Sequence, residues 1–149
     1  MYSNKSLLKE IQDILINKFG EVEDTISYDF NFTDYYEEEM GKNLKKDIIV
    51  FKQEIQTKQL AGIKEYTNQL ENKYRAEEKR RINIDPGYLT KEELILASNK
   101  KSPYKIEISD NIYAHLTLKF ENNKCRITYR TYPDFKMEKI QRFLLKIKN

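Results

Sequence analysis

A change of hydrophobic period close to the N-terminus constrains the fold of this chain more than any other feature. Apolar side chains recur at helical spacing from Leu7 to Phe19, and Gly20 follows as a stop signal. We therefore expect an amphipathic helix that begins at an N-cap of Ser3 or Ser6. From Thr25 to Phe32 apolar and polar residues alternate, which is typical of a strand with one buried face.

Later segments continue this mixture of helix and strand. The further elements that we expect are a short helix at Tyr35–Gly41 capped by Asp34, a strand at Leu44–Phe51, a helix from about Thr57 that ends before Lys79, a hairpin of Tyr104–Ile108 with Ile112–Phe120, a strand at Cys125–Tyr129 and a last helix opened by Pro133–Asp134. The run Leu94–Ala97 is too short to assign to helix or strand, although Thr90 and Glu93 ahead of it have capping-box spacing.

This order of elements predicts the α+β class. We expect a two-layer sandwich in which a mainly antiparallel sheet is covered on one face by helices. The order fits a ferredoxin-like arrangement followed by a β-hairpin extension. A chain of 149 residues suits one domain, residues 1–149, with a single core.

Charge and cysteine content indicate which binding partners and which cellular compartment to expect. Charged residues make up 34% of the chain but the net charge is only +3, which favours a mixed solvated surface and leaves nucleic acid open as a partner. Cys125 is the single cysteine, so the composition fits a reducing, cytoplasmic setting. The longest apolar run is Ile48–Phe51, far too short to span a membrane, so we expect no membrane partner.

The segment Arg80–Thr90 concentrates polar groups around a Pro-Gly pair. Asn83 and Asp85 alternate with isoleucines, so an extended segment here would bury the isoleucines and present the amide and the carboxylate. Pro86 and Gly87 then predict a turn in which Gly87 takes a positive φ angle.

Several short stretches, spread over nearly the whole chain, share a pattern with one known family. They are Phe30–Tyr36 with Glu39–Gly41, Thr67–Asn68 with Leu70–Glu71, Arg80–Thr90, Ile112–Ala114 and Thr131–Asp134. In these stretches the chain resembles an uncharacterised bacterial family, domain-of-unknown-function family 4416. The resemblance implies no activity, since no member has one that could be carried over. Some relatives bear a generic GTP-binding description, but this chain has no Gly-x4-Gly-Lys-Ser/Thr phosphate loop.

The chain also departs from the pattern of that family. Relatives carry Ser-His-Arg where this chain has Pro103–Lys105, and an acidic residue where it has His115. They also begin with an apolar strand ahead of the first helix, whereas this chain starts at Met1–Ser3. We therefore expect either that the natural product starts upstream or that the chain self-associates through an exposed strand edge, at Tyr28–Phe32 or Ile112–Phe120.

Three groups of residues are candidates for chemical sites: carboxylates, the single histidine and a set of tyrosines. Carboxylates from separate segments suit an Mg²⁺ or Mn²⁺ site, but the same residues are also expected as helix caps and turn residues; they are Asp34, Glu37, Glu38, Glu39, Asp85 and Asp134. His115 alternates with apolar neighbours, so we expect it on a wetter face of its strand as an ordinary polar residue. Tyrosines near cations in the second half suit core edges or, as the weaker interpretation, a stacking surface; they are Tyr104, Tyr113, Tyr129 and Tyr132.

The resulting hypothesis is a non-catalytic binding module with a polar site for a small polar ligand or a nucleotide. The alternative is a metal-dependent phosphoryl-transfer or phosphoester-hydrolysing enzyme that uses the carboxylates; the sequence assigns no cofactor and no catalytic residue. In the favoured hypothesis the turns at Asp34–Tyr36 and Asn83–Tyr88 form the main polar cleft. The ligand-binding residues are Asp34, Tyr35, Tyr36, Asn83, Asp85, Tyr88 and Tyr132.

Overall fold

The computed structural model describes residues 1–149, which divide into two compact units. Unit 1 comprises Met1–Glu54 and Asn68–Ile84, and unit 2 comprises Ile55–Thr67 and Asp85–Asn149. One boundary between them falls inside helix α3, Leu60–Lys73, which follows the 3-10 turn η1 at Thr57–Gln59. That residues 1–149 fold as one domain stays a prediction, which concerns independent folding.

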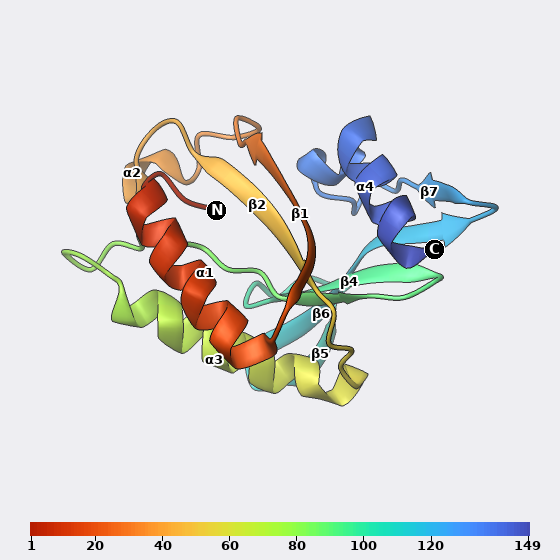
Figure 1. Ribbon diagram of the computed structural model, residues 1–149, viewed down its shortest axis with the longest axis horizontal. Coiled ribbons are helices and arrows are strands. Elements are labelled where there is room, and N and C mark those ends of the chain that lie inside the picture. The colour runs from red at the N-terminus through yellow and green to blue at the C-terminus, as the bar shows by residue number, and fades with distance from the viewer. The chain divides into compact units, whose positions relative to one another are not determined.

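In unit 1, helix α1 packs across a two-stranded hairpin (Figure 1). Helix α1 spans Lys5–Phe19, and strands β1 (Val22–Asp29) and β2 (Lys45–Phe51) pair in antiparallel register. The N-cap of α1 is Asn4, whose side-chain oxygen accepts from the Leu7 amide at 3.0 Å, and not Ser3 or Ser6. Asn4 is the N-cap because its side chain, three residues ahead of the Leu7 amide, can accept a hydrogen bond from it.

The predicted capping by Asp34 is wrong. Helix α2 spans Glu37–Met40, its N-cap is Tyr36, and no side chain caps it. Asp34 contributes its backbone carbonyl, which accepts from the Glu37 amide at 2.9 Å, so the carboxylate stays exposed. Met40 packs with Met1 and Leu44 in a small apolar cluster of unit 1.

Tyr2, which precedes α1, pairs through its backbone with two different segments of unit 1. Tyr2 forms isolated antiparallel bridges to Lys45 on β2 and to Ile82. Its hydroxyl donates to the Asp47 carboxylate at 3.0 Å. The segment around Ile82 is thus an extended part of unit 1 even though it is not a named strand.

Unit 2 is built on a five-stranded antiparallel sheet in the order β3, β4, β6, β5, with β7 also pairing with β6. The strands are β3 Gly87–Leu89, β4 Glu93–Ser98, β5 Ile106–Ser109, β6 Ile112–Glu121 and β7 Lys124–Arg126. The open assignment of Leu94–Ala97 is therefore strand. Thr90 does bond the amides of Glu92 and Glu93 through its hydroxyl, but it does so in the turn of the β3–β4 hairpin.

The predicted turn at Pro86–Gly87 is also wrong, because Gly87 opens strand β3 and only Gly20 and Gly41 among the glycines have a positive φ. A glycine is needed at this position for close approach. A Cβ atom on Gly87 would lie 2.3 Å from the Ile95 carbonyl oxygen and 2.6 Å from a methyl group of Leu96.

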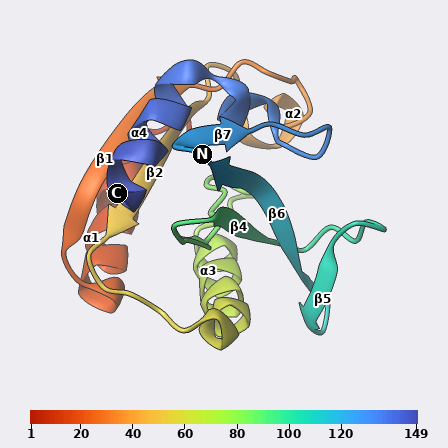
Figure 2. The ribbon, with the colours of Figure 1, turned by 90° about the vertical axis from the view of Figure 1, so that its right-hand side faces the viewer.

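Strand β6 is central to unit 2, with β5 near one end and β7 near the other (Figure 2). On one edge it pairs with β4 from Tyr113 to Lys119. On the opposite edge β5 reaches Ala114 and β7 begins at Lys119. The proposed free edge at Ile112–Phe120 is therefore largely paired, and only a short stretch between β5 and β7 lacks a strand neighbour.

One face of this sheet packs on the first turns of α3. Leu60 forms a buried cluster with Ile95, Ala97 and Ile112. At the other end of unit 2, the 3-10 turn η2 (Pro133–Lys136) leads into α4 (Glu138–Lys148), which lies beside β7. Contacts here include the thiol of Cys125, which approaches the carbonyl oxygen of Gln141 at 4.0 Å.

The α+β class with antiparallel strands agrees with the sequence-based prediction. The strands form two sheets, however, so the single ferredoxin-like sheet is not observed. No helix of the chain combines the length and the apolar character needed to cross a membrane.

Candidate ligand-binding site

A tightly bonded turn follows β7 in unit 2. The Thr131 amide donates to the Thr128 carbonyl at 3.1 Å, which closes a four-residue turn, and the Thr128 amide donates back to the Thr131 hydroxyl at 3.0 Å. The Arg130 amide donates to the Thr128 hydroxyl at 3.1 Å. This Tyr129 turn, Thr128–Thr131, therefore presents Tyr129 and Arg130 from a fixed backbone.

Two bonds attach the Tyr129 turn to strand β6, at the stretch that lacks a strand neighbour. The Thr131 hydroxyl donates to the Thr117 carbonyl at 2.9 Å, and His115 Nε2 lies 3.0 Å from the Arg130 carbonyl. Thr117, Thr131 and His115 are all buried. The turn thus takes the place of a strand at this part of the edge.

From the buried His115, a series of aromatic and cationic side chains in contact with one another extends to the surface. The His115 ring lies 4.5 Å from the ring of Tyr132 and 5.7 Å from that of Tyr104. The Arg130 guanidinium lies 5.0 Å from the Tyr104 ring and 5.2 Å from the Tyr129 ring, within cation–π range of both. We call these five residues the Tyr129 cluster.

The Tyr129 cluster is graded from buried to exposed. His115 is 1% exposed, Tyr104 is 39% exposed and Tyr129 is 80% exposed. The Tyr129 hydroxyl also accepts from Arg130 Nε at 3.0 Å, so the exposed ring is held in place. An ordered, exposed aromatic ring contributes little to the core and is suited to contact with a ligand.

His115 is held in its neutral form. Burial lowers the pKa of His115, and the nearby cations Lys105 and Arg130 lower it further, although the bond to the Arg130 carbonyl acts in the opposite direction. A carbonyl accepts only from N–H, so Nε2 carries the proton and Nδ1 is left as an acceptor. Nδ1 is buried and has no hydrogen-bond partner. The expectation of a wetter face for His115 is wrong, because the Tyr129 turn covers it.

Lys105, also in unit 2, is close enough for its charge to act on His115. Its Nζ donates to the Ser98 hydroxyl at 3.1 Å and to the Lys100 carbonyl at 3.0 Å. Burial lowers the pKa of Lys105, while the charge of Asp85 acts in the opposite direction. Asp85 itself lies 3.6 Å from the buried ammonium group of Lys64 on α3.

A small open pocket of about 280 Å³ lies where the Tyr129 turn meets β6. It is lined by residues 116–119 of β6 and residues 128–130 of the turn. The lining contains two cations, Lys119 from β6 and Arg130 from the turn. The volume is slightly below the range of about 300–1,000 Å³ that is usual for small-molecule sites.

The family model described as "Domain of unknown function (DUF4416)" matches residues 1–149, the whole chain. The chain belongs to this family. No curated protein and no solved structure matches it. Tyr104 and His115, both at positions where the sequence was expected to depart from the family pattern, have rings 5.7 Å apart in the Tyr129 cluster.

The seven site residues predicted from the DUF4416 sequence are divided between the units. Unit 1 contains Asp34, Tyr35, Tyr36 and Asn83, and unit 2 contains Asp85, Tyr88 and Tyr132. Of these, Tyr132 belongs to the Tyr129 cluster and Asp85 forms an ion pair with Lys64. Tyr88 packs against the Leu60 core cluster of unit 2.

Asn83 has a structural role in unit 1. It is 8% exposed, so it is not presented to solvent as the alternating pattern predicted. Its side-chain oxygen accepts from Arg80 Nη1 at 2.7 Å, and its backbone exchanges two bonds with Met1. Arg80 also binds both carboxylate oxygens of Glu39 at 2.9 Å, which lowers the pKa of Glu39 through that hydrogen bond.

Tyr35 and Tyr36 form a second aromatic cluster, confined to unit 1. Their rings lie 5.0 Å apart, Tyr36 lies 6.1 Å from Phe30, and Tyr35 is 63% exposed. This Tyr35 cluster is followed directly by the acidic first turn of α2, Glu37–Glu39. The two clusters therefore have opposite electrostatic surroundings.

The residues that sequence reasoning did not select are Tyr104, Tyr129, Arg130 and His115. Their signal was the density of tyrosine and basic residues in the second half of the chain, which the sequence alone gives no means of separating from core packing. The bonds of Thr128 and Thr131 were needed to show that Tyr129 sits on a turn.

The candidate carboxylates do not form a metal cluster. No three His, Cys, Asp or Glu side chains come together in an arrangement that could hold a metal ion. Asp34 and Glu37–Glu39 lie in unit 1, while Asp85 and Asp134 lie in unit 2. Asp85 is engaged with Lys64, and Asp134 is 1% exposed in η2.

Proposed function

We propose that this DUF4416 chain is a non-catalytic binding module of the bacterial cytoplasm, with a site in unit 2 for a small polar ligand or a nucleotide. The observation that carries the proposal is the Tyr129 cluster, which ends in an exposed aromatic ring held by Arg130. A planar ligand group that stacks on Tyr129 would extend a series of contacts already formed inside the protein.

The polar groups near the Tyr129 cluster suit a ligand that carries negative charge. Arg130 and Lys119 line the same pocket, and Lys119 has no ion-pair partner. Cations in a partly enclosed site bind phosphate or carboxylate groups more strongly than cations on an open surface. A group that stacks and also carries phosphate is a nucleotide.

The binding module is favoured over a metal-dependent enzyme because the candidate carboxylates do not gather into a metal-binding group. Hydrolysis or transfer of a phosphoryl group by a metal site needs several oxygen ligands around one cation. This chain brings no three candidate ligands together.

The test is a thermal-shift screen of the 149-residue chain against nucleoside mono-, di- and triphosphates, each with and without Mg²⁺ or Mn²⁺. A ligand that binds the native state raises the melting temperature, and the shift grows with ligand concentration. We expect a shift with nucleotide that needs no metal and that is lost in Tyr104→Ala. The exposed Lys58→Gln variant in unit 2 is the charge-matched control for Arg130→Gln.

Two results would contradict the proposal. One is a nucleotide shift of unchanged size in Tyr104→Ala and Arg130→Gln, which would place the ligand elsewhere. The other is a shift that appears only with Mg²⁺ or Mn²⁺ and is accompanied by release of inorganic phosphate, which would favour the enzyme.

A further inference from the structure

The two units of this chain carry opposite net charge. Unit 2 contains 15 Lys and Arg residues against 9 Asp and Glu residues, and unit 1 contains 12 against 15. The near-neutral total of +3 therefore hides a basic unit and an acidic unit. Positive charge concentrated on one unit attracts polyanions, with an effect that depends on salt.

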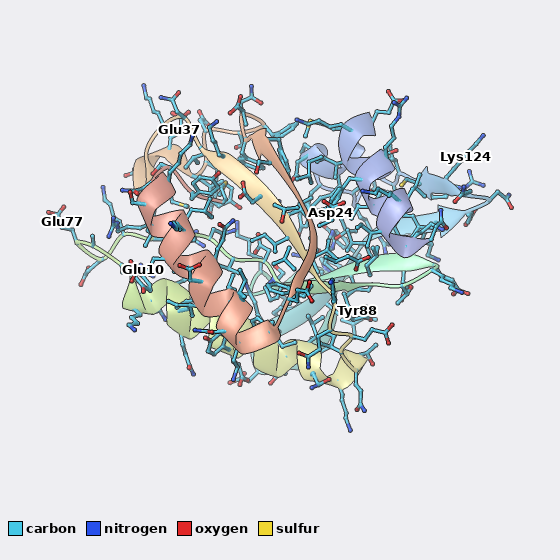
Figure 3. The ribbon with its side chains drawn as sticks, in the orientation of Figure 1. Glu10, Asp24, Glu37, Glu77, Tyr88 and Lys124 are labelled. Atoms are coloured by element: carbon cyan, nitrogen blue, oxygen red, sulfur yellow. The ribbon has the colours of Figure 1, made fainter.

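Part of this positive charge lies on the β6–β7 hairpin, which leads into the Tyr129 turn. Lys119 pairs across the β6–β7 ladder with Arg126, and Lys124 lies at the turn of the same hairpin (Figure 3). Arg126 is partly neutralised by Glu121 at 2.7 Å, whereas Lys119 and Lys124 are exposed and have no ion-pair partner. A row of cations thus follows the hairpin that leads into the Tyr129 turn.

Aromatic rings beside such a row are the combination that binds single strands of nucleic acid. Bases stack on exposed rings whatever their sequence, and the backbone phosphates follow the neighbouring cations. Tyr129 provides the ring, Arg130 fixes that ring and adds a charge, and Lys119 and Lys124 continue the charge along the hairpin. A single nucleotide would use only the first part of this surface.

We propose that unit 2 binds single-stranded nucleic acid, with one base stacked on Tyr129 and the adjoining phosphates on Arg130 and Lys119. This inference rests on the proposed nucleotide-binding function and extends it from one nucleotide to a strand. The Tyr35 cluster of unit 1 is the internal comparison, because its exposed ring precedes the acidic turn Glu37–Glu39, which repels phosphate.

The experiment measures fluorescence anisotropy of 5′-labelled oligothymidine and oligouridine of about four, eight and twelve nucleotides, the lengths that span known single-strand site sizes. AMP and UMP serve as unlabelled competitors. We expect the affinity to rise with strand length, and Tyr129→Ala to weaken it about tenfold, the amount expected for loss of one base–aromatic stack. Tyr129→Phe keeps the ring and should restore most of the binding.

Salt dependence tests the phosphate contacts separately. The logarithm of the affinity should fall linearly with the logarithm of the salt concentration, and Lys119→Gln should reduce the slope by about 0.7, the value for one phosphate contact on a single strand. Lys58→Gln changes the net charge of unit 2 equally and should leave the slope unchanged.

The possible outcomes separate this inference from the function on which it rests. If UMP or AMP binds but longer strands bind no more tightly, the single-strand proposal is overturned and the nucleotide-binding function stands. If neither nucleotides nor strands bind, both are overturned. A loss in Tyr35→Ala as large as that in Tyr129→Ala would also overturn the assignment to unit 2.

Discussion

Gly87 shows how a single residue can be required for a reason that local sequence does not reveal. The Pro-Gly pair predicted a turn, but Gly87 lies in β3 with its Cα against the backbone of Ile95. A side chain at this position would collide with backbone atoms, which have little freedom to move. The requirement for glycine comes from packing between neighbouring strands, and not from φ.

We predict that Gly87→Ala lowers the free energy of unfolding by about 1–3 kcal/mol, the usual cost of overpacking. The measurement is urea denaturation followed by circular dichroism. Gly62→Ala is the matched control, because no atom lies within 4 Å of a Cβ added there and its helical position gains about 0.5–1 kcal/mol from the replacement. Equal effects of the two substitutions would contradict the close-approach argument.

His115 predicts a pH dependence of stability whose sign can be stated. Burial lowers its pKa in the folded chain below the value of about 6.5 expected when unfolded. As the pH falls through that value the unfolded chain takes up a proton that the folded chain does not bind, so stability is present above about pH 6.5 and is lost below it. The loss is complete once the pH has passed below the folded pKa.

The variant His115→Gln isolates this effect, because the glutamine amide can still donate to the Arg130 carbonyl but does not titrate. We expect the unfolding free energy of the natural chain to fall more steeply between about pH 7 and pH 5 than that of the variant. Parallel curves from chemical denaturation over this range would show that His115 is not held neutral.

Among individual residues, the sequence predicted identities better than roles. Asn83 and Asp34 were selected as ligand groups for their polar chemistry, yet Asn83 is a buried tie to Arg80 and Asp34 offers its backbone. Burial depends on contacts distant in sequence, and alternation along one segment does not contain that information. Tyr132, which was predicted as a ligand-binding residue, lies in the Tyr129 cluster.

At the scale of elements, the segment after α3 is tied to α2 through one arginine. Arg80 contacts Glu39 through Nε, Nη2 and its own backbone amide, and it reaches Asn83 through Nη1. Glu39 and Arg80 are 30% and 23% exposed, so the pair is shielded more than an ordinary surface pair.

We expect Arg80→Ala to lower the unfolding free energy by about 1–3 kcal/mol, since it leaves shielded acceptors without donors. The neighbouring Arg81→Ala is the control, because Arg81 is exposed, and such surface changes stay within about 0.5 kcal/mol. Guanidinium denaturation of both variants makes the comparison. A null effect of Arg80→Ala would mean that the contact forms without stabilising the chain.

The sequence predicted best those elements whose hydrophobic pattern is regular or whose turn signal is clear. The helix ending at Gly20, the strand pairing of 106–109 with 112–121 and the helix ahead of Lys79 all appear close to their expected bounds. The run 94–97 was ambiguous because a buried strand and a buried helical turn look alike in four residues. Thr90 bonds the same amides that a capping box would, but in a hairpin turn.

For the whole molecule, α3 contributes its first turns to unit 2 and its last turns to unit 1. A helix forms and melts cooperatively, so loss of either unit should destabilise the helix segment of the other. We therefore predict a single calorimetric transition, lowered in common by Gly87→Ala in unit 2 and Arg80→Ala in unit 1. Two transitions, each responding to one substitution, would show separate domains.

The class of the fold followed from the sequence, whereas its topology did not. Alternating periods establish that helices and antiparallel strands coexist, but strand order depends on which edges pair, and the strands here form two sheets instead of one. The binding surface was harder still, because the Tyr129 turn depends on threonine bonds to residues on another strand.

Cys125 on β7 is the only thiol of the chain, so its rate of alkylation reports on this part of unit 2. Burial raises the pKa of Cys125, and the thiolate is the form that reacts, so iodoacetamide should modify the native chain slowly. Because the thiol is only partly buried, the rate of modification reports both its thiolate fraction and its exposure beside α4. A single strand of nucleic acid bound at the neighbouring Tyr129 turn should slow the alkylation of Cys125. Mass spectrometry measures this rate without any label or substitution.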